Sequence, residues 1–520
     1  MESNYPNKHP AIFKLNEDLL FTIFYENASL NNHVGTMNTD WTYSENSAND
    51  GFTSRVVNTL RFTSQVCQVW RRLVINSPSL WGKAVDLDLL AVGKPEWGKE
   101  VVRRTGNALL DVRGTIRYGT IRGARNTGPL LELILQQHWA RVRTFYINIY
   151  GVDNIDPNAW QAIYQPAKYL ELFHLSTEYR AGSTITDGLL FAGDAPVLQN
   201  FRASHDLFSP DCSWLRQLRY LTFDMAELEG QFWFSLLQFL VILPELSLLE
   251  GLSMDGGDMS LWPSELQPGS DALTDFTLPR LRFISFHGGV NACTALLRYL
   301  TPGVGSSLKL SLTSQETDNI NELLEPLQRY SNNFFKNHNA TSLYVSYADD
   351  GVDIRHSRDS FIFPPWNATY YRGFEDFEIG IETTSSTSVD VMYTVLRSML
   401  SSSLHSIKYL HLTDRSWEGC PLDPAHPYFI DFLFKFSGVE TLYTNQDTLS
   451  ALSEINSSDS GQIFPKLREL TVWVEDPMDS YSVNVFFERR AKEGAPLESA
   501  QIEYEDTGDG NESNELLDND

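Results

Sequence analysis

Apolar residues near the start of the chain recur every three to four positions, which is the spacing of one helical face. Residues 15–24 read L-N-E-D-L-L-F-T-I-F, so Leu19, Leu20 and Ile23 fall on one side of a helix. Asn16 stands where a side-chain oxygen caps the first turn, and the two acidic residues after it suit the positive end of the helix dipole. The pattern predicts a short amphipathic helix.

A second pattern with the same spacing runs from residue 60 to residue 74 and predicts one helix that ends before Pro78. Residues 29–58, between the two helices, are rich in Asn, Ser and Thr and show no sustained apolar period. That composition is typical of a loop that does not pack. We therefore expect a mobile insert within a small helical module at residues 10–90.

Beyond Trp81 one short pattern, apolar-x-x-apolar-x-apolar, keeps returning. Its last two apolar positions alternate with polar ones, as a strand with one buried face requires. The first positions Leu218, Leu249 and Leu281 lie 31 and 32 residues apart, and helix-like stretches separate the copies. Each repeat therefore supplies a strand and usually a helix. The copies begin at Val142, Leu170, Leu218, Leu249, Leu281, Ile407, Leu467 and Leu497.

These repeats predict a curved parallel β-solenoid with outer helices over residues 91–503. The pattern weakens between Ser311 and Ile381, where we expect the solenoid to be distorted. Residues 504–520 are acidic and lack aromatic side chains beyond the first position, so we expect a disordered tail. The predicted fold class is α+β and multi-domain: a small helical module followed by an irregular α/β solenoid.

Charge and composition limit the classes of binding partner and the cellular compartment that we expect. The 520 residues carry a formal net charge of -27, which repels phosphate backbones and anionic lipid headgroups, so we expect neither nucleic acid nor a membrane as partner. The four cysteines are far apart and form no C-x-x-C pair, which favours a reducing compartment, cytoplasmic and/or nuclear. No secretory signal is visible at residues 1–10, and the longest apolar stretch, residues 232–243, is too short to span a bilayer.

The order of the N-terminal motifs resembles the F-box-like family. L-N-E-D-L-L-F-T-I-F is followed, after the insert, by S-Q-V-C-Q-V-W-R-R-L and S-P-S-L-W. The resemblance covers residues 10–90, and the family often carries leucine-rich repeats after this module. It implies that the module docks on a Skp-type adaptor of a cullin-containing ubiquitin ligase, through Leu15, Leu19, Leu20, Ile23, Phe24, Val66, Cys67, Trp70, Leu73, Pro78, Leu80 and Trp81.

The chain departs from the family pattern at two places: Asn16 stands where the family usually has Pro, and the insert is longer than in compact members. The leucine-rich-repeat-like solenoid is expected to hold an unidentified protein substrate. Strand geometry points alternate side chains away from the core, so the expected capture surface is the strand face. Its candidate residues are Tyr146, His174, Tyr220, Thr222, Ser285, Tyr409, His411, Tyr443 and Thr471.

The sequence leaves alternatives to this function. A leucine-rich scaffold that has lost adaptor binding is one, and the Asn16 departure favours it. A carboxylate-using hydrolase on a repeat scaffold is another, although H-E-x-x-H, G-x-S-x-G and G-x-x-x-x-G-K-[ST] are absent. We expect no cofactor, no metal and no catalytic residue, because ubiquitin transfer would occur on other subunits. The segment from Lys99 to Arg143 contains nine cationic and only three acidic residues. This excess of positive charge predicts either a solvated surface or an anion-binding pocket.

Overall fold

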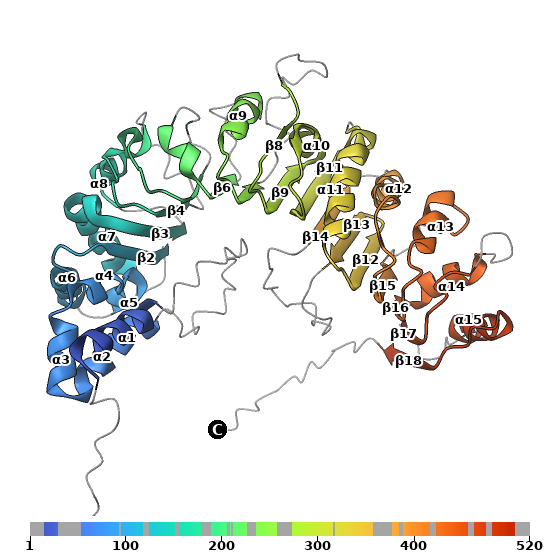
Figure 1. The fold of residues 1–520 in the computed structure, drawn as a ribbon, viewed down its shortest axis with the longest axis horizontal. Helices are drawn as coiled ribbons and strands as arrows, with labels where there is room; N and C mark the ends of the chain where they lie inside the picture. Colours follow the sequence, from blue (N-terminus) through green and yellow to red (C-terminus); the bar gives the residue numbers. More distant parts are fainter. Residues whose placement is uncertain are drawn as a thin grey trace, which may run out of the picture. The chain divides into compact units, whose positions relative to one another are not determined.

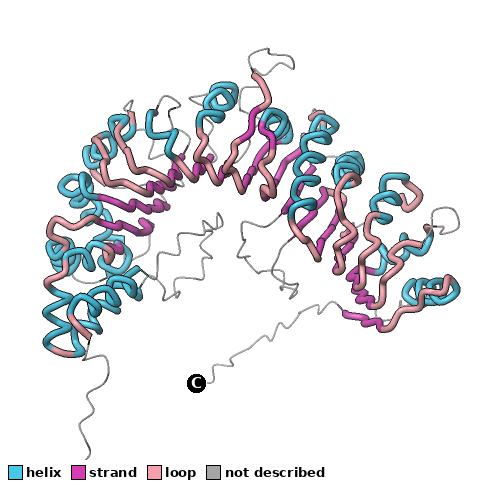
Figure 2. The backbone as a smooth tube through the Cα atoms, viewed as in Figure 1, coloured by secondary structure: helices cyan, strands magenta, loops and turns pink. Residues whose placement is uncertain are grey.

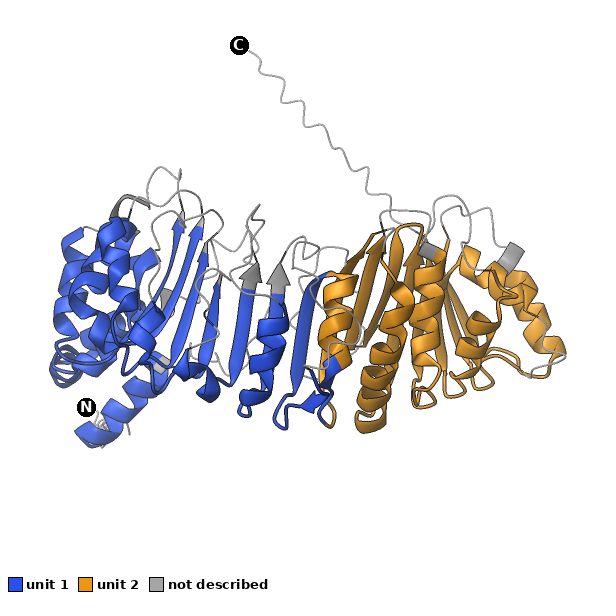
Figure 3. Cartoon of the chain, turned by 90° about the horizontal axis from the view of Figure 1, so that it is seen from above, with its two compact units in different colours: residues 1–288, 299–303, 366–374 blue, residues 289–298, 304–365, 375–520 orange. Residues whose placement is uncertain are grey.

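A computed structural model describes the chain in two compact units (Figure 3). The first unit comprises residues 1–288, 299–303 and 366–374, and the second comprises residues 289–298, 304–365 and 375–520. The described residues are 15–29, 54–92, 95–117, 124–150, 155–177, 189–204, 209, 212–225, 236–256, 273–315, 318–356, 377–383, 388–415, 423–455, 462–474 and 481–504.

Four helices open the first unit: α1 (Glu17–Ser29), α2 (Ser54–Val66), α3 (Gln68–Ile75) and α4 (Pro78–Gly82). The predicted first helix is confirmed, and the Leu19 N–H donates to Asn16 Oδ1 at 2.8 Å, so Asn16 caps it. The prediction of one helix over residues 60–74 is wrong. Cys67 has an extended backbone and its Sγ accepts from the Trp70 N–H at 3.5 Å, so it ends α2 and caps α3.

The predicted insert at residues 29–58 is corrected at both ends. Ser29 is the last residue of α1, and residues 54–58 are the first turn of α2 rather than loop. Residues 30–53 lie outside the described part of the chain. The sheet begins at Val85, inside the range expected to be helical, because two residues there pair with the strand that starts at Leu110.

The first unit continues as alternating strands and helices in which all neighbouring strands of the main sheet are parallel. In sequence and sheet order the strands are β1 (Val85–Asp86), β2 (Leu110–Arg117), β3 (Val142–Tyr150), β4 (Leu172–Thr177), β5 (Asn200–Ser204), β6 (Tyr220–Met225), β7 (Gly251–Gly256) and β9 (Phe283–Gly289). A separate parallel pair joins β8 (Phe276–Thr277) to β10 (Leu300–Thr301).

Helices follow the strands and cover one face of this sheet, while the other face is formed by the strands (Figures 1 and 2). They are α5 (Leu87–Val92), α6 (Pro95–Arg104), α7 (Ala124–His138), α8 (Pro157–Trp160) and α9 (Leu236–Ile242), with short 3-10 turns at Trp139–Arg141, Gln161–Tyr164, Leu190–Gly193, Ser213–Gln217 and Leu243–Glu245.

The core of the first unit lies between the strands and the helices. Corresponding strand positions hold large apolar residues, and parallel pairing places them side by side. Phe173 stacks on Phe145 and Phe201, with ring centroids 5.4 and 5.7 Å apart. The buried row in register is Val112, Phe145, Phe173, Phe201, Leu221, Leu252 and Ile284.

The second unit has the same two layers. Its strands are β11 (Ser307–Ser314), β12 (Ser342–Ala348), β13 (Gly351–His356), β14 (Phe377–Thr383), β15 (Tyr409–Asp414), β16 (Thr441–Asn445), β17 (Glu469–Val474) and β18 (Ser499–Tyr504). Its helices are α10 (Val290–Tyr299), α11 (Leu324–Asn337), α12 (Ser388–Met399), α13 (Pro427–Phe434), α14 (Gln446–Glu454) and α15 (Tyr481–Lys492), with a 3-10 turn at Ile320–Leu323. The last residue of α10, Tyr299, is assigned to the first unit.

Strand order explains why the repeat weakens between Ser311 and Ile381. The order is β11-β14-β13-β12-β15-β16-β17-β18, so β13 lies antiparallel between β12 and β14. A hairpin partner does not need the helical crossover that a parallel neighbour needs, and this interrupts the strand-helix spacing. The predicted strands are confirmed at every repeat copy, and both units are mixed α/β with mostly parallel strands. Among the described helices, none combines the length and apolar character needed to cross a membrane.

Candidate functional site

Helices α1 to α3 leave large apolar side chains in solvent. Leu19 and Ile23 lie one turn apart on α1, and Phe62 and Val66 lie one turn apart on α2. Together with Val69 on α3 these side chains are 39–62% exposed. We call these five residues the helical apolar surface. Large apolar residues exposed on several packed helices are typical of a partner-binding site.

The buried faces of the same helices hold the module together. Phe24 contacts Trp70 edge to face, with ring centroids 4.9 Å apart. The Trp81 indole N–H donates to the backbone carbonyl of Val74 at 2.9 Å, which satisfies a buried donor. Leu20 and Leu60 are buried with them. A small helical segment therefore uses one apolar face internally and exposes the other.

The predicted adaptor residues divide into three groups in the structure. Leu20, Phe24, Leu80 and Trp81 are buried. Leu15, Cys67, Trp70 and Leu73 are half-buried, and Leu19, Ile23, Val66 and Pro78 are exposed. The sequence reasoning missed Phe62 and Val69. Phe62 could have been found, because it lies four positions before Val66.

The strand face of the first unit carries one row of the predicted capture residues. Pairing places Tyr146 beside His174, and Arg202 separates His174 from Thr222. The Tyr146 and His174 rings stack at 3.9 Å, and His174 Nε2 lies 2.8 Å from Asn148 Oδ1. Burial, together with the Arg202 charge, holds the pKa of His174 well below its usual value. His174 and Thr222 are buried, so the accessible parts of this row are its half-exposed members.

Two further predicted residues of this unit are placed by the same pairing. Ser285 is in register with Ser253, which pairs with Thr222, so it belongs to the same row. Tyr220 lies in the neighbouring row, and its ring packs on Gly251, where an added Cβ would come within 2.8 Å of Tyr220 Cδ1. Its hydroxyl donates to Glu250 Oε2 at 3.2 Å, and burial and that carboxylate raise the Tyr220 pKa.

The second unit carries a separate row. Tyr344, His411, Tyr443 and Thr471 occupy corresponding positions on β12, β15, β16 and β17. The ring centroids of Tyr344 and His411 are 4.5 Å apart, and those of His411 and Tyr443 are 6.4 Å apart. His411 and Thr471 are buried, whereas Tyr443 is half-exposed and Tyr409, in the next row, is exposed. Burial and the Arg415 charge lower the pKa of His411 to about 3.

A group of charged side chains adjoins this row on β13 and β14. Arg355 contacts Asp353 at 2.5 Å and Glu378 at 3.5 Å, and the Arg415 guanidinium donates to the Tyr344 hydroxyl. Burial raises the pKa of Asp353 despite the neighbouring Arg355. Arg355 of β13 is thus paired with a carboxylate on each of these two strands.

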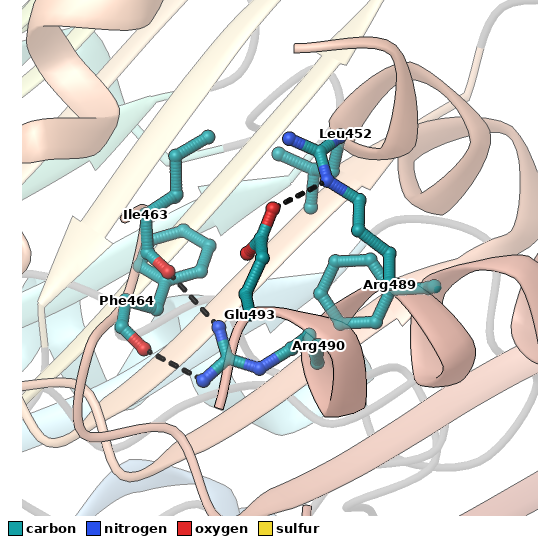
Figure 4. Close-up of a pocket in the computed structure, with 7 residues that line it drawn as sticks. Leu452, Ile463, Phe464, Arg489, Arg490 and Glu493 are labelled. Carbon is teal, nitrogen blue, oxygen red and sulfur yellow. Dashed lines mark hydrogen bonds and ion pairs between the residues drawn. The ribbon is translucent and has the colours of Figure 1, made fainter. Parts of the chain in front are cut away.

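A small pocket between α14 and α15 is lined by Leu452, Ile463, Phe464, Phe486, Arg489, Arg490 and Glu493 (Figure 4). Arg490 is buried and donates to the carbonyls of Ile463 and Phe464 at 3.0 and 3.2 Å. Arg489 donates to the Ser453 carbonyl at 2.5 Å and to Glu493 Oε1 at 2.9 Å. Arg489 thus holds the last turn of α14, and Arg490 holds the segment after it, so donors of both guanidiniums are already used by the protein.

The remaining sequence hypotheses can be compared with this geometry. Among the described cations between Lys99 and Arg143, Arg103 and Arg104 pair with Glu100, and Arg143 pairs with Asp111. Within the part of the chain that the structure describes, no group of three or more His, Cys, Asp or Glu side chains could hold a metal ion. Cys67, Cys212 and Cys293 are not joined in disulfides, and Cys420 lies outside the described residues.

No protein-family model matches the chain, and a comparison with curated proteins returns no match.

Proposed function

We propose that this chain is the substrate-recognition subunit of a cullin-type ubiquitin ligase. The helical apolar surface would bind a Skp-type adaptor, and the strand faces would hold a protein substrate, as expected of an F-box-like module followed by a leucine-rich-repeat-like solenoid. Such a receptor acts by proximity, since it brings a bound protein to catalytic subunits that carry out the transfer.

The helical apolar surface is the observation that carries the proposal. Leu19 and Ile23 of α1 and Val66 of α2 belong both to the family motif and to the exposed set. Burying such side chains against a partner contributes about 25 cal/mol for each Å² removed from water. Exposure of these apolar side chains to water does not stabilise the fold. Contact with a partner protein would explain why they are apolar.

The departure at Asn16 is compatible with this role. A Pro at the start of a helix fixes the backbone of the first turn. Here the Asn16 side chain accepts from the Leu19 N–H at 2.8 Å, so α1 begins in an ordered way without proline. The substitution therefore leaves Leu19 and Ile23 one turn apart on a formed helix.

The experiment is capture of the full-length chain by a purified Skp-type adaptor. Changing Leu19 and Val66 together to Asp should weaken capture by more than about 30-fold, because charged groups at an apolar interface centre cost about 2 kcal/mol or more. The fold should be retained, since exposed substitutions usually alter stability by less than about 0.5 kcal/mol each.

Val241 on α9 provides a matched control, because it is 54% exposed, as is Val66, but lies away from α1 to α3 in the sequence. Val241→Asp should leave adaptor capture unchanged. Undiminished capture by the Leu19 and Val66 double variant would contradict this surface, and no capture by the wild-type chain would favour a scaffold without a ligase role.

A further inference from the structure

Acidic and aromatic side chains gather on the strand face formed by β15 to β18, which lie side by side at the end of the second unit (Figure 1). Alternation on these strands sends Leu410, Leu442 and Leu470 into the core, so their neighbours point to the other face. We call the following set the acidic aromatic face: Tyr409, Tyr443, Glu469, Trp473 and Glu503.

Strand register brings these five residues together. Thr441 pairs with Tyr409 on one side and with Glu469 on the other. Trp473 pairs with Glu503, four residues further along the strands. Tyr443 lies midway between these two rows on β16. The two carboxylates are thus on adjacent strands and about 13 Å apart along the strand direction, given about 3.3 Å per residue.

Both carboxylates are held in place without being neutralised. The Thr441 hydroxyl donates to Glu469 Oε2 at 3.1 Å, and the Trp473 indole N–H donates to Glu503 Oε2 at 2.8 Å. Within the described part of the chain neither carboxylate forms an ion pair. Uncharged donors orient a carboxylate but leave its negative charge available to a ligand.

Cations that flank these strands are engaged with other residues. Lys408 lies 3.2 Å from Glu440 and Arg468 lies 3.6 Å from Glu498, and both pairs precede the strands. Arg415, after β15, donates to the Tyr344 hydroxyl. Burial and the charges of Glu469 and Glu503 raise the pKa of the Tyr443 phenol, as expected in a negative local field.

We propose that the acidic aromatic face binds an extended protein segment that carries two Lys or Arg side chains about four residues apart. A cation between Tyr409, Tyr443 and Glu469 gains both a ring-face contact and a charge-assisted hydrogen bond, and a second cation gains the same from Trp473 and Glu503. The net charge of -27 favours approach of a basic segment. This inference rests on the proposed function, because it names the chemistry of the substrate that the strand face holds.

The test uses the full-length chain and a fluorescent extended peptide with two Arg residues separated by three neutral residues, followed by anisotropy. We expect saturable binding that weakens with added salt, since exposed charges are screened within about 8 Å at physiological ionic strength. The same peptide with citrulline in place of Arg keeps the shape and removes the charge, so it should bind at least about tenfold more weakly.

Site variants then locate the binding. Glu469→Gln with Glu503→Gln should weaken the Arg peptide by about tenfold or more. Glu488→Gln with Glu498→Gln removes the same charge from residues that already pair with Lys492 and Arg468, and it should leave binding nearly unchanged. Tyr443→Ala should also weaken binding, and circular dichroism should show that all variants fold.

Equal losses in the two double variants would overturn the proposal, because general charge rather than this face would then determine binding. Equal binding of the citrulline peptide, or preference for a peptide with Glu in place of Arg, would overturn it as well. Adaptor capture is measured on the same protein preparations. Adaptor binding without Arg-peptide binding would reject the basic substrate and leave the proposed function standing, and the reverse result would reject only the adaptor role.

Discussion

Removal of Arg143 should destabilise the first unit strongly, because this residue neutralises a buried carboxylate. Its guanidinium contacts Asp111 through two hydrogen bonds, Nε to Oδ1 at 3.0 Å and an Nη to Oδ2 at 2.8 Å. The Asp111 side chain is only 2% exposed. The hydrogen bonds that Arg143 donates to the Asp111 carboxylate raise the pKa of Arg143, and a hydrogen bond with Tyr25 of α1 adds to it.

The magnitude follows from what Arg143→Met leaves behind. Met keeps much of the apolar part of the Arg143 side chain. It leaves the Asp111 carboxylate buried without a cationic partner, in a site that water scarcely reaches. Breaking a buried ion pair in this way costs about 3–5 kcal/mol. Asp111→Asn with Arg143→Met removes both charges, so the double variant should be more stable than Arg143→Met alone.

Urea unfolding followed by tryptophan fluorescence measures this effect in the first unit, which contains Trp139, Trp160 and Trp214 as buried reporters. The two-unit chain requires separate fitting of each transition, since a single two-state free energy does not describe it. A change below about 0.5 kcal/mol for Arg143→Met would refute the reasoning, as would a double variant whose loss equals the sum of the single losses.

Two further predictions concern the cores of the two units. The pKa of His411 is lowered to about 3, so the unfolded chain takes up a proton below about pH 6.5 while the folded chain does not. The second unit should therefore lose stability as the pH falls below about 6.5, by roughly 2–3 kcal/mol at pH 4.5, and His411→Gln should reduce this slope in urea titrations; identical slopes would contradict the assignment. Phe173→Ala should lower the unfolding free energy of the first unit by about 3–5 kcal/mol, because Phe173 is fully buried between two stacked rings. Tyr169→Ala, at a position 52% exposed, is its control and should change stability by less than about 0.5 kcal/mol.

Local patterns in the sequence were enough to predict the strands and the first helix. The alternation at Phe173 and Leu175 and the near-constant spacing of repeats such as Leu249 and Leu281 are properties of single segments, and each segment forms the predicted strand. Asn16 caps α1 through an oxygen within its own turn. Such features depend on neighbours in sequence, so no knowledge of the distant chain is needed to anticipate them.

The helix boundary at Cys67 and the position of β13 in the sheet could not be predicted from such local patterns. Apolar spacing continues in the sequence across Cys67, although the backbone there is extended and ends one helix before the next begins. The spacing of apolar residues does not record where the backbone hydrogen bonds stop. The antiparallel β13 lies between its sequence neighbours β12 and β14, whereas β11 pairs with β14 and β12 pairs with β15, so the sheet order departs from the chain order at those two places. Pairing between strands is decided by tertiary packing, which a single-segment pattern does not contain.

The local sequence pattern and the tertiary packing together determine the candidate surfaces. Helical spacing told which apolar residues share a face, but only packing decided that Leu20 and Phe24 turn inward while Leu19, Phe62 and Val69 remain in water. Likewise, alternation placed Tyr443 on the outer strand face, whereas register placed Glu469 of β17 and Glu503 of β18 two positions before and two positions after it along the strand direction. The sequence by itself thus determined the period of each element, and the tertiary structure decided which faces and charges meet, because burial and pairing depend on residues distant in the chain.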